Sequence, residues 1–236
     1  MRPGHNVFIV CAPHPRAGVT TTAILLTEYL TWRGLQPEGF DTDPYESAFA
    51  NRFAGQARVT DISTTQGQIS LFDQLLVCDG RPKVVDVWNR SFQKFYTILQ
   101  ETGFVEEAKR LSIDVVILYC ADELPASLVT ARQISQLWPD APMIAAVNEG
   151  AAEFQGDVHR LMADFPTRLN LHIRELDAQV SRTINKETFS YTDFLNDPPF
   201  DMSILARSAL RKWLVHIFKQ FQYLEQNGVI NGTDLR

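Results

Sequence analysis

Residues 11–23, CAPHPRAGVTTTA, join two segments of different character, and this junction decides the fold. The preceding run VFIVCA, residues 7–12, is continuously apolar, which is typical of a central strand in a parallel sheet. The following run VTTTAILLTEYLTWR, residues 19–33, has apolar residues at helical spacing, and Gly34 ends that helix. The junction is therefore predicted to be a strand-to-helix turn that contains a glycine followed by threonines.

The rest of the chain alternates apolar segments with amphipathic ones. Strands are expected at residues 37–44, 83–88, 113–121, 141–150 and 170–176. Helices are expected at residues 45–55, 89–111 (interrupted near Gly103), 123–138, 151–165, 177–186 and 202–227. Residues 56–70 have no clear assignment, residues 71–78 fit a helix end or an edge strand, and residues 191–200 form a polar, proline-containing stretch.

This alternation predicts right-handed βαβ units and a mainly parallel sheet. We therefore expect one three-layer α/β/α domain over residues 1–236, with residues 229–236 as a loose tail. Ligands of such folds bind at the carboxyl ends of the strands. The segments APHPRAGVT, DTDP, DVWNRS and NEGAA are all predicted to lie there, which makes that edge the expected site.

The bulk composition is that of an ordinary globular protein, with a formal charge of −6 and a pI of about 5.4. This acidic balance argues against bulk DNA binding, which usually needs a basic surface. Cys11, Cys78 and Cys120 all lie in or beside apolar runs, so we expect buried, reduced thiols in a cytoplasmic protein. No apolar run reaches the roughly 18 residues of a membrane span, and we expect no secretory signal.

A phosphate-binding loop needs converging backbone N–H groups, glycines that permit a tight turn, and the partial positive charge of a helix N-terminus. The common pattern G-x-x-x-x-G-K-[ST] places its lysine on the β- and γ-phosphates and its hydroxyl on Mg²⁺. In this chain the four defining positions are Pro13, Gly18, Val19 and Thr20. The second glycine and the hydroxyl are retained, whereas proline and valine replace the first glycine and the lysine.

The segment HPRAGVTTTA resembles the loop K-G-G-V-G-K-T-T of the ParA/MinD family of deviant-Walker P-loop ATPases. His14 stands in the place of the family's signature lysine, which reaches across a dimer interface, and Pro15 and Arg16 stand in the places of two glycines. The resemblance implies a P-loop NTPase-like fold that binds ATP or ADP with Mg²⁺. It assigns the nucleotide to Pro13, His14, Arg16, Ala17, Gly18, Val19, Thr20, Thr21 and Asn148.

Three further segments follow the family's order. DTDPY, residues 41–45, resembles the D-x-D-P-Q segment, in which the first acid, here Asp41, orients the attacking water. VVDVW, residues 84–88, resembles the Walker B strand, so Asp86 would hold Mg²⁺ together with Thr20. AAVNEG, residues 145–150, resembles the later strand that ends in an adenine-facing asparagine, here Asn148. The resemblance thus assigns catalytic roles to Asp41 and Asp86.

Each of these residues also has a simpler structural interpretation. The threonines can begin a helix as N-cap residues. Asp41 and Asp43 can cap the short helix that follows them. Asp79, after LLVC, is a rival for the Walker B acid, and Asn148 can be a turn former before Gly150.

Three functions remain open. The first is a ParA/MinD-like dimerising switch in DNA partition or intracellular positioning. The second is a pseudo-ATPase scaffold that has lost hydrolysis, because valine cannot supply the charge-assisted contact of the lysine. The third is an unrelated α/β enzyme with His14 as acid or base, for which no partner carboxylate is evident. Enzyme activity therefore stays undecided.

The partners follow from the resemblance and from one helix. We expect a homodimer and a protein partner. The predicted last helix, SILARSALRKWLVHIFKQFQYL, residues 203–224, is amphipathic and carries basic residues, so membrane contact is conceivable. Its broad apolar face favours packing on the core instead, through Leu205, Leu210, Trp213, Leu214, Ile217, Phe221 and Leu224.

Overall fold

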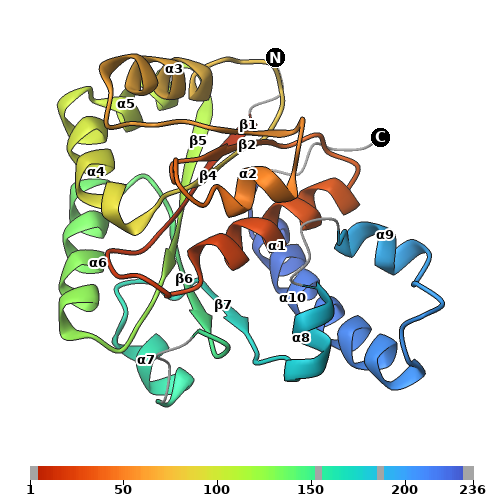
Figure 1. Ribbon diagram of the computed structural model, residues 1–236. Coiled ribbons are helices and arrows are strands. Elements are labelled where there is room, and N and C mark those ends of the chain that lie inside the picture. Colours follow the sequence, from red (N-terminus) through yellow and green to blue (C-terminus); the bar gives the residue numbers. More distant parts are fainter. Residues whose placement is uncertain (1–4, 152–155, 185–188, 231–236) are drawn as a thin grey trace.

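The computed structural model describes residues 5–151, 156–184 and 189–230. Their strands form one parallel sheet in the order β3-β2-β4-β1-β5-β6-β7 (Figure 1). The strands are β1 (His5–Cys11), β2 (Glu38–Asp41), β3 (Ala57–Val59), β4 (Lys83–Asp86), β5 (Ile113–Cys120), β6 (Met143–Asn148) and β7 (Asn170–Ile173). The predicted parallel α/β sheet is thus confirmed, with the first strand in its centre.

Helices cover both faces of this sheet. One layer consists of α3 (Thr65–Leu75), α4 (Phe92–Glu101), α5 (Phe104–Arg110) and α6 (Pro125–Leu137), with the short turn η1 (Asn89–Ser91) before α4. The other consists of α1 (Val19–Trp32), α2 (Ala48–Arg52), α8 (Ala178–Ile184), α9 (Tyr191–Asn196) and α10 (Ile204–Gln226). Helix α7 (Val158–Asp164) lies at the end of β6. The architecture is the expected three-layer α/β/α sandwich.

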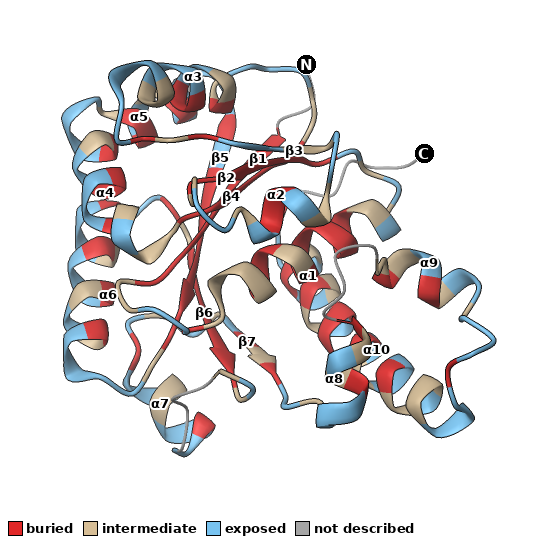
Figure 2. Cartoon of the chain, viewed as in Figure 1, coloured by how far each residue is buried: buried red, intermediate tan, exposed pale blue. Residues whose placement is uncertain are grey.

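The core consists of two apolar clusters, one on each side of the sheet (Figure 2). Strand β1 is buried along its whole length, because alternate residues contribute to opposite clusters: Val7 and Ile9 to one, Phe8 and Val10 to the other. This two-sided burial explains why the segment is continuously apolar.

The polar stretch of residues 191–200 had no assigned element, and it contains α9. The carboxylate of Glu28 accepts the backbone N–H groups of Tyr191 and Thr192 and so caps this short helix. Two expectations need correction. Cys78 is exposed rather than buried, since its apolar run ends in α3 before the cysteine is reached. The predicted loose tail begins too early, because Ile230 is buried; residues 231–236 lie outside the described residues.

Helix α10 packs on the core with one face. The buried side chains are Leu210, Leu214, Ile217, Phe218, Phe221 and Leu224. Leu205 is an exception to the predicted face, because it is 83% exposed in the first turn of the helix. Within the part of the chain that the structure describes, no helix is long and apolar enough to cross a membrane.

Candidate functional site

The segment between β1 and α1 is a tight loop that ends at Gly18. Gly18 has a left-handed backbone with φ 87° and directly precedes the first residue of α1, Val19. A Cβ atom at this position would lie 2.5 Å from Nδ2 of Asn148. Both the positive φ and the close approach of Asn148 require glycine here. The chain therefore turns sharply at Gly18 directly before α1, which is the local requirement for a phosphate-binding turn at a helix N-terminus.

Arg16 also has a left-handed backbone, with φ 61°. This conformation is rare for a long side chain and costs roughly 1–2 kcal/mol. It occurs where the resembled loop has a glycine, so the backbone path needs that conformation and the sequence tolerates its cost. Pro13 and Pro15 lack backbone N–H groups, so the loop offers fewer donors to an anion than a glycine-rich one.

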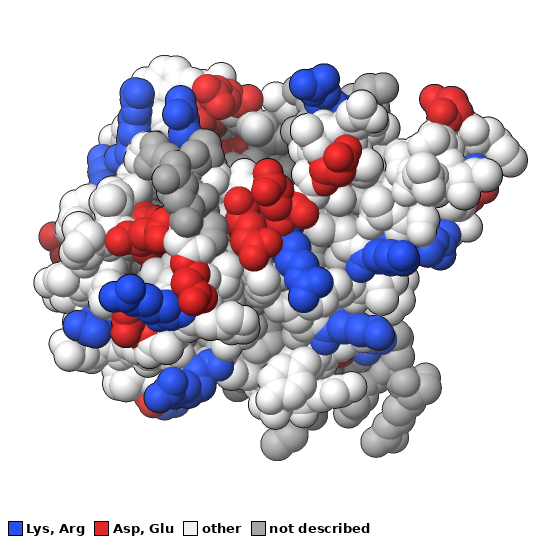
Figure 3. Space-filling view, turned by 90° about the horizontal axis from the view of Figure 1, so that it is seen from below, with Lys and Arg blue, Asp and Glu red and all other residues white. Residues whose placement is uncertain are grey.

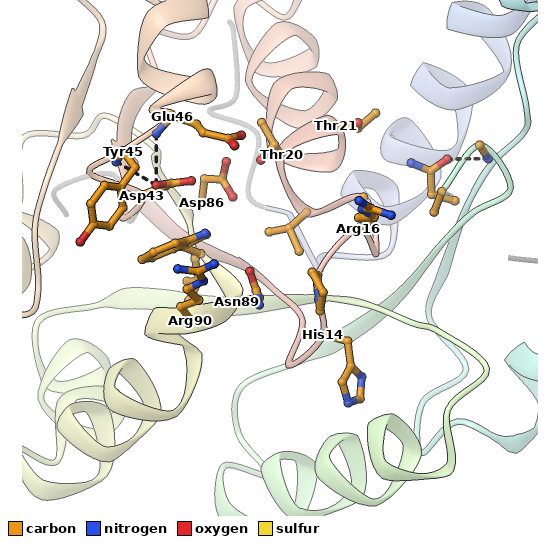
Figure 4. A pocket seen from close by; sticks show the side chains of 18 residues that line it. His14, Arg16, Thr20, Thr21, Asp43, Tyr45, Glu46, Asp86, Asn89 and Arg90 are labelled. Atoms are coloured by element: carbon orange, nitrogen blue, oxygen red, sulfur yellow. Dashed lines mark hydrogen bonds between the residues drawn. The ribbon is translucent and has the colours of Figure 1, made fainter. Parts of the chain in front are cut away.

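A cavity of about 660 Å³ opens beside this loop (Figure 4). The polar side chains that line it come from the ends of β1, β2, β4 and β6: His14, Arg16, Thr20, Thr21, Asp43, Tyr45, Glu46, Trp88, Asn89, Arg90, Asp86 and Asn148. Of the predicted loop residues, Pro13 and Ala17 do not line it; Ala17 is buried and packs in the core. The topology thus brings together segments that are more than 130 residues apart, from His14 to Asn148.

Thr20 and Asp86 lie near each other in the middle of the cavity (Figure 4). Thr20 is at the start of α1, and Asp86 is at the end of β4. Asp86 is buried, and this burial, together with the nearby charges of Asp41 and Asp43, raises its pKa to about 8. A hydroxyl and a carboxylate are oxygen ligands of the kind that Mg²⁺ prefers. These two residues therefore fit the predicted metal position.

Asp41 has a structural task in this arrangement. Its Oδ1 accepts the N–H of Asp43, and its Oδ2 accepts the N–H groups of Phe49 and Ala50 at the start of α2. It is buried and does not line the cavity. The helix-capping interpretation therefore describes its contacts, and its predicted role with water stays a prediction. Asp43 is the acid of this segment that faces the cavity.

The alternative Walker B acid, Asp79, is excluded by position. It precedes β4 and bonds with Lys83 at the amino end of that strand, through a distance of 2.8 Å. The loop between β1 and α1 lies at the carboxyl end of the sheet, where Asp86 ends β4.

Three residues at the outer edge of the cavity form a group that we call the aromatic rim: Tyr45, Trp88 and Arg90. The rings of Tyr45 and Trp88 have centroids 5.4 Å apart, and the Arg90 guanidinium lies 5.2 Å from the Trp88 ring. The sequence pattern does not predict this rim, because Trp88 ends the run KVVDVW, which predicts a strand. The segment WNR, residues 88–90, which begins two residues after Asp86, is the available sequence signal.

Asn148 touches the loop on the other side. Its Oδ1 accepts the N–H of Gly150, which is the turn-forming contact, and its amide packs against Gly18. A second cavity, of about 440 Å³, shares Thr21, Asn148 and Gly150 with the first. The loop is therefore flanked by ligand-sized space on two sides.

His14 has the carboxylate partner that the sequence did not reveal. Its Nδ1 lies 2.9 Å from Oδ2 of Asp122, which follows β5, and Oδ1 of Asp122 accepts the N–H of Leu124. In Figure 4 the His14 ring points away from Asp86. Asp122 lies two residues after the end of β5, and this position was the sequence signal for the partner. The pair ties the loop to the β5–α6 connection of the same chain.

Charges on this face are mixed. Figure 3 looks toward the edge where the strands end and shows acidic and basic side chains interspersed, rather than one continuous basic surface. Among the residues with described positions, no group of three or more His, Cys, Asp or Glu side chains has the arrangement of a metal site. A divalent cation would therefore need ligand oxygens besides Asp86 and Thr20.

No family model and no curated protein matches this chain. Among solved structures, it is similar to a nucleotide-binding protein from Archaeoglobus fulgidus in complex with ADP, with 10% sequence identity and a TM-score of 0.49. The similarity covers 84% of this chain and 93% of that one. The fold class rests on the parallel sheet and its two helical layers.

Proposed function

We propose that this chain is a nucleotide-binding protein of the ParA/MinD type that binds ATP or ADP with Mg²⁺ and has lost efficient hydrolysis. The observation that carries the proposal is that Thr20 and Asp86 line one cavity together, beside the left-handed turn at Gly18. Thr20 and Asp86 would hold the magnesium ion, and the ion would neutralise phosphate charge. Arg16 and the N-terminus of α1 would hold the phosphates.

The loss of hydrolysis follows from the charges around the terminal phosphate. Val19 occupies the position of the lysine and contributes no cation, while Asp43 and Glu46 add carboxylates to the same cavity. His14 bonds with Asp122 of its own chain, so it is not held in a position to replace the signature lysine across a dimer. Negative charge that develops in the transition state would therefore be poorly stabilised.

A scaffold that binds no nucleotide is the second candidate. It is favoured by the two prolines of the loop, since Pro13 and Pro15 each remove an N–H donor. The homodimer and the protein partner that the resemblance implies belong to both proposals. Light scattering with and without nucleotide measures whether dimers form and whether nucleotide drives them.

Isothermal titration of MgATP and MgADP separates the candidates. We expect the wild-type protein to bind both, and Thr20→Ala to weaken binding by about tenfold, because it removes a hydrogen bond to charged groups. Thr130→Ala is the matched control, since Thr130 lies on α6 and bonds only within its own helix. An absence of binding at millimolar nucleotide would reject the proposal in favour of the scaffold. Equal binding by wild type and Thr20→Ala would reject the proposed site, because the nucleotide would then bind without Thr20.

A further inference from the structure

The contacts proposed above for ATP, through Thr20, Asp86, Arg16 and the N-terminus of α1, leave the aromatic rim without a role. Tyr45 is 79% exposed and stands over the cavity beside Trp88. Trp88 is fixed from below, because its backbone N–H donates to the hydroxyl of Thr42, which is completely buried. The rim is therefore an exposed tyrosine ring beside a half-buried tryptophan ring, and the two are tilted by 52°. A planar ring that stacks on one of them meets the other at an angle.

Arg90 adds a cation to this platform. Its guanidinium lies over the Trp88 ring, and within the described ranges it has no ion-pair partner. Figure 4 shows Arg90 and Tyr45 on one side of the cavity and Arg16 on the other, with Asp86 and Thr20 between them. The rim thus lies beyond the metal position, on the side away from the phosphate-binding loop.

The electrostatics at that position disfavour a free terminal phosphate. Asp43 and Glu46 line the cavity between Asp86 and the rim, and the lysine that would oppose them is Val19. A terminal phosphate monoester carries about two negative charges near neutral pH, whereas a diester carries one. A phosphate chain whose far end is esterified therefore meets less repulsion here than ATP does.

Space for a ring also exists on the opposite side of the loop. The second cavity shares Thr21 and Asn148 with the first and is bordered by apolar side chains, including Ile24, Ile173 and Leu176. A base could lie there while its phosphates follow the loop toward Asp86. The two cavities therefore offer places for two rings, with the phosphate-binding loop between them.

We propose that the ligand of this site is a polyphosphate capped by a nucleoside at each end, with its second base packed against Tyr45 and Trp88. The proposal rests on the nucleotide-binding function proposed above. It assigns the aromatic rim as the part of the site that selects a doubly capped ligand over ATP.

The test compares diadenosine tetraphosphate with ATP, both with Mg²⁺, by isothermal titration. We expect the wild-type protein to bind the capped ligand about tenfold more tightly, which is the typical effect of stacking one base on an aromatic side chain. Trp88→Ala and Tyr45→Ala should each lower that preference, while their affinity for ATP stays within about twofold of wild type. Trp88→Phe should keep most of the preference, because a ring remains.

Tyr223→Ala is the matched control for Tyr45→Ala. Tyr223 is 63% exposed on α10 and does not line the cavity, so its loss should leave both affinities unchanged. Because Tyr45 is largely in solvent, its variant keeps the test valid even where Trp88→Ala does not fold. Equal affinity of the wild type for both ligands, or an equal loss for both in the rim variants, would overturn this inference and leave the nucleotide proposal standing. No binding of either ligand would overturn both.

Discussion

The two ends of strands β2 and β4 carry buried charges in opposite arrangements. The strands pair in register, with Glu38 opposite Lys83 at their amino ends and Asp41 opposite Asp86 at their carboxyl ends. One end therefore holds a pair of opposite charges, and the other holds two acids.

The amino end is electrostatically complete. The Lys83 ammonium is fully buried and donates to Glu38 at 2.7 Å and to Asp79 at 2.8 Å. Arg58 also pairs with Glu38. Each buried charge has partners of opposite sign, so this network needs no ligand.

The carboxyl end lacks such compensation. Asp86 is about as buried as Glu38, yet no basic side chain pairs with it within the described ranges, and its burial raises its pKa. Asp41 satisfies its oxygens with backbone N–H groups instead. Buried charges on the same two strands thus have a structural role where they are paired, and a candidate ligand-binding role where they are not.

The largest predicted effect comes from removing Lys83, the buried cation at the amino ends of β2 and β4. Lys83→Met should lower the free energy of unfolding by about 3–5 kcal/mol at pH 7, because Glu38 and Asp79 lose their common cation. Urea denaturation measures this loss. Lys109→Met is the control: its partner Asp140 and Lys109 itself are largely exposed, so little change is expected. Similar losses in the two variants would contradict the structural role of the buried network.

The next effect concerns the incomplete end. Asp86 has a pKa of about 8 in the folded protein, above the ordinary value of 3.8, so the folded state holds its proton more tightly than the unfolded state. Stability should therefore fall as the pH rises from about 4 toward 8. Between pH 5 and 8, we expect the wild type to lose about 2–4 kcal/mol more than Asp86→Asn does. Parallel pH curves from urea titrations of the two proteins would refute the uncompensated burial of Asp86.

The smallest predicted effect distinguishes the backbone strain at Arg16 from the proposed role of its side chain in binding phosphate. Arg16→Gly should raise the free energy of unfolding by about 1 kcal/mol, since glycine accepts the left-handed backbone without strain. Ser112→Gly, at φ 60° and away from the cavity, should give a similar gain. Only Arg16→Gly should weaken MgATP binding, by about fivefold, through the loss of a charge-assisted contact. Unchanged binding in that variant would remove Arg16 from the proposed site.

The sequence predicted the long elements well because their patterns are local. The buried strand β1 and the amphipathic helix α1 follow directly from apolar spacing. The short elements β3 and α9 were missed, because three or six residues carry too little pattern and α9 depends on Glu28 from a distant helix. Cys78 shows the same limit, since its exposure depends on where α3 ends.

The site was predicted to the extent that it lies in one loop and one strand end. Thr20 and Asp86 line the same cavity, because one begins the helix after β1 and the other ends the neighbouring strand β4; their roles stay a prediction. The contacts of Asp122 and of the aromatic rim depend on which strands are neighbours, which the sequence alone does not state. The pairing of Glu38 with Lys83 could not be predicted either, because it depends on β2 and β4 being neighbours.

The central claim is that the loop between β1 and α1 still binds phosphate although valine replaces its lysine. Isothermal titration of MgATP into Val19→Lys, beside wild type and the uncharged control Val19→Met, tests this most directly. We predict that the lysine variant alone gains about 10- to 100-fold in affinity, which is the typical contribution of a charged hydrogen bond. If Val19→Lys folds and binds MgATP no better than Val19→Met, the loop is not a phosphate cradle and the account is wrong.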